Sequence, residues 1–197
     1  MARPREFDPD HALEQATQAF WAKGFENTSL DELCETTGLG RSSLYAAFGD
    51  KRALYLRALE RYEEATAARI AAALAVAPVR RAVERFLRGM VDDIAAGPGR
   101  RGCFIGNCAA EMARLDRGAA ARVRASLARI EGAFREGLDK ARARGELSAG
   151  ADTTALARFL TAGIQGLRLV GKANPDRAAL SDITRMLLCC LDFQGED

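Results

Sequence analysis

Apolar residues recur every three or four positions along most of the chain, and no stretch alternates apolar and polar residues for long enough to form a strand. This spacing predicts an all-α protein. Capping residues, prolines and glycines divide the pattern into successive helices. The first helix is expected to be capped by Asp8, to begin at Pro9 and to end at Gly24. A long helix is predicted over 51–77, and the next one should start at Pro78.

Two short helices joined by a glycine turn are predicted between residues 28 and 54. Thr28 is expected to cap the first of them, with Asp31 three residues later as its acidic partner. Gly38 follows Thr37, where this helix should stop, and its freedom to adopt a positive φ allows a tight turn into the next helix. Such a pair is typical of a helix-turn-helix, which places its second helix in the major groove of DNA.

The second of these helices is predicted over 41–48, with Leu44 and Phe48 facing inward. Its outward face would then consist of Arg41, Ser42, Ser43, Tyr45 and Ala46. The surrounding residues 39–57 carry four basic side chains against one acidic side chain, so positive charge gathers on this part of the chain. A patch of this size makes few phosphate contacts, and useful affinity should therefore require two subunits. The alternative is that the two helices serve only to pack the domain.

The N-terminal sixty residues resemble the DNA-binding domain of the TetR family of one-component transcriptional regulators. The matching residues are Leu13, Ala16, Phe20, Gly24, Phe25, Thr28, Ser29, Leu33, Gly38, Leu39, Leu44, Tyr45, Phe48, Lys51 and Leu54. The resemblance implies a helical homodimer whose N-terminal domains bind a palindromic operator and whose C-terminal domains bind an effector. It also implies that Thr28, Tyr45 and Lys51 contact phosphates, while Arg41, Ser42 and Ser43 approach bases. Ala46 would contact thymine methyl groups.

The composition agrees with a soluble protein that has a substantial core. The 197 residues are 48% hydrophobic, enough for an N-terminal helix-turn-helix domain over 1–64 and a helical effector-binding and dimerisation domain over 65–197. No basic segment followed by an apolar stretch opens the sequence, and no segment has the pattern of a membrane span. We therefore expect a cytoplasmic protein. Five cysteines without CxxC spacing and a single histidine predict reduced thiols, no metal and no cofactor.

The GPGRRG segment at 97–102 matches the GxGxxG pattern of dinucleotide-binding proteins. That pattern requires a preceding strand, whereas a helical stretch precedes it here, so we interpret the segment as a loop.

The helix predicted after this loop carries the candidate effector residues, which are Cys103, Phe104, Asn107, Cys108 and Glu111. Asn107 and Glu111 lie four residues apart and would be polar groups that orient a ligand in an apolar pocket. The alternative is that Asn107 bonds a neighbouring helix end and Glu111 is solvated.

Cys103 is a candidate sensor of oxidants or electrophiles. It stands at a helix start, just after Arg100 and Arg101, and both features favour a thiolate. Cys108 lies too far around the helix to form a disulfide with Cys103 unless the helix unwinds. The alternative for Cys103 is simple packing in the core.

The last two predicted helices each carry an apolar stripe and resemble the dimer-forming pair of the same family. The residues expected in the dimer interface are Phe159, Gly163, Leu167, Ile183, Leu187 and Cys190. Two such helices from each subunit would form a four-helix interface, and its two-fold symmetry would match a palindromic operator. The alternative is that both helices close the core of one subunit.

These observations predict a sequence-specific DNA-binding transcriptional regulator. It would be a repressor released from its operator by a small molecule or by an electrophile or oxidant. An all-helical enzyme is the main alternative, but the sequence has no convergent set of acid and base residues, so we expect no enzymatic activity. A helical adaptor that binds protein partners through the 97–102 region is another.

Overall fold

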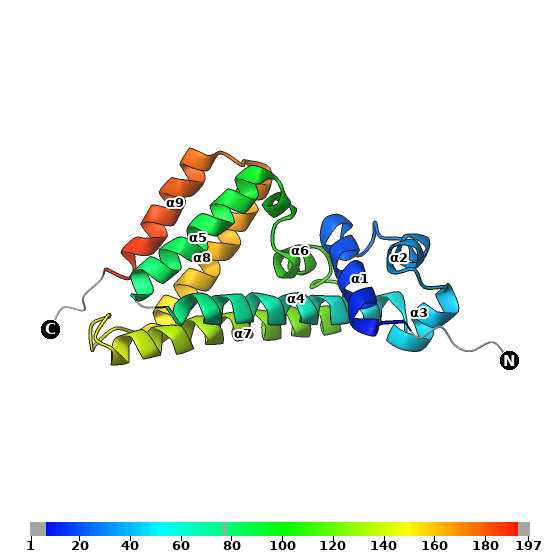
Figure 1. The fold of residues 1–197 in the computed structure, drawn as a ribbon, viewed down its shortest axis with the longest axis horizontal. Coiled ribbons are helices and arrows are strands. Elements are labelled where there is room, and N and C mark those ends of the chain that lie inside the picture. Colours follow the sequence, from blue (N-terminus) through cyan, green and yellow to red (C-terminus); the bar gives the residue numbers. More distant parts are fainter. Residues whose placement is uncertain (1–6, 77, 193–197) are drawn as a thin grey trace. The chain divides into compact units, whose positions relative to one another are not determined.

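The computed structural model describes residues 7–76 and 78–192. The regular structure of these residues is entirely helical, which confirms the all-α prediction for this part of the chain. The helices labelled in Figure 1 are α1 (Pro9–Lys23), α2 (Leu30–Thr37), α3 (Arg41–Phe48), α4 (Lys51–Leu74), α5 (Val79–Ala96), α6 (Phe104–Glu111), α7 (Arg117–Ala143), α8 (Thr153–Ala173) and α9 (Arg177–Cys189). A short 3-10 helix, η1 (Pro98–Arg101), occupies the loop before α6.

The helices form two compact units that do not follow the order of the chain. The first unit contains the described residues of 1–62 together with 107–123, and the second contains those of 63–106 and 124–197. The end of α6 and the start of α7 therefore belong with the N-terminal helices, an association that the sequence pattern did not indicate. The functional boundary between residues 64 and 65 stays a prediction.

Local signals fix the ends of the helices in the first unit. The Asp8 side chain accepts hydrogen bonds from the backbone N–H groups of Asp10 and His11, and Pro9 opens α1 as predicted. Gly24 ends α1 with a φ of +84°, a conformation that favours glycine. The Asp50 carboxylate accepts from the N–H of Ala53 and caps α4.

Aromatic rings fill the core of the first unit. The ring of Tyr55 on α4 packs edge-on against Phe20 and Phe25, with centroids 5.0 and 5.2 Å apart. Trp21 and Tyr62 make a similar contact at 4.9 Å. These contacts hold α1 against the first half of α4.

In the second unit α5, α8 and α9 pack against one another (Figure 1). Leu87 and Ile94 of α5 and Leu160 and Leu167 of α8 are almost completely buried. Phe86 meets Phe134 of α7 edge-on at 6.2 Å. Burial of these side chains supplies most of the stability of a helical unit of this kind.

Two predicted helix ends differ from the structure. α4 ends at Leu74 rather than at Ala77, and residue 77 lies outside the described residues. The sequence spacing of Phe104, Cys108, Met112 and Leu115 predicts that this helix continues to Leu115. Instead α6 ends at Glu111, and Leu115 lies in the following turn with 88% of its surface exposed.

Candidate nucleic-acid interface

The turn before α2 corrects one part of the sequence prediction. Ser29, not Thr28, caps α2, and its hydroxyl accepts a hydrogen bond from the N–H of Glu32 at 3.1 Å. Thr28 is completely buried and donates its hydroxyl to the carbonyl of Gly24 at 2.7 Å. Its side chain therefore closes the turn between α1 and α2. The resemblance implied that Thr28 contacts a phosphate, but its buried hydroxyl is not offered to one.

The turn between α2 and α3 forms as predicted. Gly38 adopts the left-handed conformation, with φ +69° and ψ 13°. The Thr37 hydroxyl donates to the carbonyl of Leu33 and accepts weakly from the N–H of Leu39, which secures the chain on both sides of the glycine. Leu33 and Leu44 are buried beneath the turn and hold α2 and α3 together.

The outward face of α3 consists of the residues that the pattern predicted. Leu44 and Phe48 are 2% and 4% exposed and anchor the helix. The side chains on the solvent-facing side are Arg41, Ser42, Ser43, Tyr45 and Ala46, all of them exposed. Gly40 precedes α3 and supplies no side-chain cap. A short helix that presents arginine, hydroxyl and methyl groups to solvent can enter a major groove and contact base edges there.

Basic side chains beside α3 are held by contacts within the first unit. The Nζ of Lys51 lies 4.4 Å from the centre of the Phe25 ring, and the guanidinium of Arg57 lies 4.9 Å from that of Phe48. Arg57 also donates to the carbonyl of Ala47 at 3.1 Å. These cation–π contacts hold the two positive charges next to α3.

The predicted effector residues of α6 are divided between the two units. Cys103 and Phe104 belong to the second unit, with 6% and 0% of their surface exposed. Cys103 immediately precedes α6, so the predicted helix start is correct. Arg100 and Arg101 donate hydrogen bonds to the carbonyls of Ile94 and Pro98.

Cys108 and Glu111 belong to the first unit, as does the half-buried Asn107. The Cys108 thiol is completely buried beside Tyr55 of α4. Burial raises the pKa of Cys108, and burial with the neighbouring thiol raises that of Tyr55. The half-buried Glu111 carboxylate has partners within the protein: it accepts hydrogen bonds from the backbone N–H groups of Phe25 and Glu26 at 3.0 and 2.9 Å.

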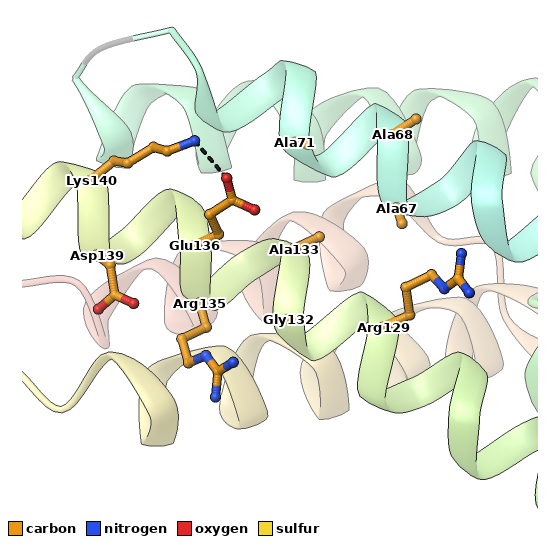
Figure 2. A pocket seen from close by; sticks show the side chains of 10 residues that line it. All are labelled: Ala67, Ala68, Ala71, Arg129, Gly132, Ala133, Arg135, Glu136, Asp139 and Lys140. Carbon is orange, nitrogen blue, oxygen red and sulfur yellow. Dashed lines mark hydrogen bonds and ion pairs between the residues drawn. The ribbon is translucent and has the colours of Figure 1, made fainter.

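Two grooves lie in the second unit, away from these residues. Figure 2 shows the first, about 810 Å³ between α4 and α7, where the small side chains of Ala67, Ala71 and Ala133 lie between charged groups. Glu136 and Lys140 form an ion pair at its rim. The second groove, of about 640 Å³, lies between α5 and α9. None of the predicted effector residues lines either groove.

Some of the predicted interface residues on α8 and α9 are buried within the subunit, and others lie at its surface. Leu167 and Leu187 are 0% and 7% exposed, so neither offers surface to a partner. Leu187 covers Gly163, where an added Cβ would lie only 2.2 Å from its Cδ2 atom. Ile183 and Cys190 are half-buried, and burial raises the pKa of Cys190 to about 11. Phe159 is exposed, and the apolar residues that accompany it at the surface are Leu169, Val170 and Met186.

Comparisons with known proteins identify the family. Residues 12–58 match the family described as bacterial regulatory proteins, tetR family. Residues 75–187 match the tetracyclin repressor-like C-terminal domain. The chain belongs to the TetR family. It is therefore a DNA-binding transcriptional regulator, and α2 and α3 are its helix-turn-helix.

Similar TetR-family proteins cover almost the whole chain. An uncharacterized HTH-type transcriptional regulator, YezE of Bacillus subtilis (strain 168), is 33% identical over 98% of this chain and 100% of its own length. The HTH-type transcriptional repressor ComR of Escherichia coli (strain K12) is 31% identical over 92% of this chain and 87% of its own. A cysteine mutant of the TetR-family regulator CifR, complexed with 26-bp operator DNA, is 31% identical, with a TM-score of 0.80 over 95% of this chain and 98% of its own.

No helix of the described residues is long and apolar enough to cross a membrane. Within the same part of the chain, no group of three histidine, cysteine or acidic side chains is placed to hold a metal ion.

Proposed function

We propose that this TetR-family protein is a homodimeric repressor that binds a palindromic operator and is released by a small-molecule, electrophilic or oxidising effector. The exposed face of α3, with Arg41 at its start, is the observation that carries the proposal. ComR, similar over most of the chain, is named as a repressor, and the CifR mutant was solved on operator DNA. A repressor of this kind acts in the cytoplasm and needs no enzymatic activity.

Within this proposal Arg41, Ser42, Ser43 and Ala46 face base edges, and Tyr45 and Lys51 face phosphates. Arginine is suited to guanine, and a methyl group is suited to thymine. Phosphate contacts position the helix without selecting a sequence. The two kinds of residue should therefore respond differently to mutation.

The effector would act through α6. The start of this helix, with Cys103 and Phe104, belongs to the second unit, and its end, with Cys108 and Glu111, contacts the helix-turn-helix unit. A ligand or a covalent adduct that displaces the start of α6 would therefore strain the contacts made by its end. A coupling free energy of about 1–3 kcal/mol is enough for useful control.

The test measures binding to DNA that flanks the coding region of this protein and to random duplex, at several salt concentrations. We expect Arg41→Ala to abolish the preference for operator DNA, and Lys51→Ala to weaken both complexes alike and reduce the salt slope by about 1 for each subunit. Arg135→Ala, which removes an exposed charge from α7, is the control. Unchanged discrimination in Arg41→Ala would contradict the assignment of α3 as the reading helix.

A further inference from the structure

Arg41, the first residue of α3, is already held by an acidic side chain of the helix-turn-helix. Its Nη2 atom lies 2.6 Å and its Nε atom 3.2 Å from the same Oδ1 atom of Asp31, in the first turn of α2. Both side chains are exposed, at 61% and 79%. An ion pair this exposed adds little to folding stability, so its main effect is on the position of the guanidinium.

The way in which Asp31 holds the guanidinium decides what remains available to DNA. A guanidinium has five N–H groups, and Asp31 receives the one on Nε and one of the two on Nη2. The two N–H groups of Nη1 and the second of Nη2 stay directed away from Asp31. One N–H of Nη1 and the second N–H of Nη2 lie side by side. This pair of donors matches the O6 and N7 acceptors of guanine in the major groove.

We propose that Asp31 is a specificity-determining residue that positions Arg41 to read one guanine in each operator half-site. The inference rests on the proposed function, because it requires α3 to be the reading helix. Asp31 fixes a flexible side chain before DNA binds, which lowers the entropic cost of the correct contact. Its negative charge also repels a phosphate that approaches this site. Affinity for DNA of any sequence is therefore lower, while discrimination between sequences is greater.

The sequence offers a matched control on the same helix. Glu35 is an exposed acidic residue near the end of α2, and no side-chain contact of Glu35 is recorded in the part of the chain that the structure describes. Both Asp31→Asn and Glu35→Gln remove one negative charge, but only Asp31→Asn weakens the hold on Arg41.

The experiment first selects a binding site from a random-sequence duplex library with the wild-type protein. Dissociation constants are then measured for the selected duplex and for duplexes in which each guanine is replaced by 7-deazaguanine or adenine. The proteins compared are wild type, Asp31→Asn, Arg41→Ala, the double variant and Glu35→Gln, each checked for an unchanged thermal melt.

For wild type we expect one replacement in each half-site to weaken binding about 10- to 100-fold, which corresponds to ~1.4–2.8 kcal/mol, as expected for a bidentate arginine–guanine contact. Asp31→Asn should lose most of this discrimination while binding random duplex as tightly as wild type or more tightly. In the Arg41→Ala background the Asp31 substitution should have no effect on discrimination. Glu35→Gln should discriminate as wild type does.

The inference would be overturned if Asp31→Asn discriminated between duplexes as well as wild type does. It would also be overturned if the Asp31 substitution reduced discrimination equally with and without Arg41. A selected site without a guanine that depends on Arg41 would overturn it as well, and would leave the regulator function intact. Failure of wild type to select any site would instead contradict the proposed function.

Discussion

The carboxylate of Glu111 accepts a hydrogen bond from the backbone N–H of Phe25 across 86 residues of sequence. Its second oxygen accepts from the next N–H, that of Glu26. The space for this carboxylate exists because residue 24 is glycine: a Cβ there would lie 2.8 Å from Oε2 of Glu111. The end of α6 is thereby fixed to the turn that leads into the helix-turn-helix.

Replacing Glu111 should loosen this turn. Glu111→Ala leaves two backbone donors without their partner, and we expect it to lower the free energy of unfolding by about 1–3 kcal/mol. Glu111→Gln keeps one carbonyl acceptor and should have a smaller effect. Urea unfolding gives the stability, and native-state hydrogen exchange should show faster exchange at the amides of Phe25 and Glu26.

Glu136→Ala is the control, because it removes a carboxylate whose ion pair with Lys140 is exposed on one helix face. A pair this exposed contributes little to stability. Equal effects of the two alanine substitutions, or unchanged exchange at Phe25, would show that Glu111 does not hold the turn.

The parts of the fold that follow from local chemistry were predictable from the sequence. Asp8, Gly24 and Gly38 act where the sequence placed them, because caps and left-handed turns depend on a few neighbouring residues. The exposed face of α3 also follows from the spacing of two apolar residues. The predicted cap of α2 was wrong by one residue because Thr28 and Ser29 are both good capping residues. They are distinguished by the hydrogen bond that Thr28 donates to the carbonyl of Gly24, four residues earlier.

Contacts between distant residues were not predictable in this way. No periodicity links Glu111 to Phe25 or Asp31 to Arg41, so the sequence assigned Glu111 to a ligand and Asp31 to a helix cap. The side of α8 that faces outward was uncertain for a related reason. Leu167 and Leu169 are equally apolar, and packing against α5 and α9 decides that Leu167 is buried while Leu169 is 69% exposed.

This difference leads to a prediction about assembly. We expect Leu169→Asp to split the homodimer and to abolish operator binding while the protomer stays folded, because its side chain is exposed on α8, as Phe159 is on the same helix and Met186 is on α9. Light scattering and circular dichroism measure the two properties. Leu115→Asp is the control, since this leucine is 88% exposed outside α8 and α9.

Leu187→Asp should behave differently, because Leu187 is buried against Gly163 and a charge there would destabilise the protomer itself. A Leu169→Asp variant that remained dimeric would remove the exposed face of α8 from the interface.

The ion pair between Arg52 and Asp116 should make the first unit sensitive to acid. The Asp116 carboxylate accepts from Nη2 of Arg52 at 2.7 Å and from the N–H of Ala119 at 2.9 Å, where it caps α7. Hydrogen bonding to Arg52 holds the pKa of Asp116 well below its ordinary value of 3.8. A lowered pKa stabilises the folded state above pH 4, and this contribution is lost as pH falls through the folded-state value.

We therefore expect Asp116→Asn to melt at a lower temperature than wild type at neutral pH, with the difference shrinking below about pH 4. Thermal melts between pH 7 and pH 2 measure this gap. Asp182→Asn, which removes an exposed ion pair of α9, should show a much smaller gap throughout. A gap for Asp116→Asn that stayed constant with pH would mean that the carboxylate charge is not the cause.

The thiol hypothesis for effector sensing gives the last prediction. None of the five cysteines forms a disulfide, and Cys103, just before α6, is only 6% exposed. An adduct larger than the thiol cannot fit into this site without moving the helix, because overpacking a filled core forces the backbone to shift. The same eight-residue helix ends at Glu111, so movement at its start should reach the turn before α2.

N-ethylmaleimide should therefore release wild type from its operator and weaken binding more than tenfold, with Cys103 modified at the same rate as release. Cys103→Ser should remain bound. Cys34→Ser and Cys189→Ser each remove a thiol that is more accessible than that of Cys103, and both should still be released. Fluorescence anisotropy gives the release rate, and mass spectrometry of quenched samples gives the modified position. Release of Cys103→Ser at the wild-type rate would show that Cys103 serves packing alone, and the effector would then be a ligand that binds reversibly rather than a reagent for this thiol.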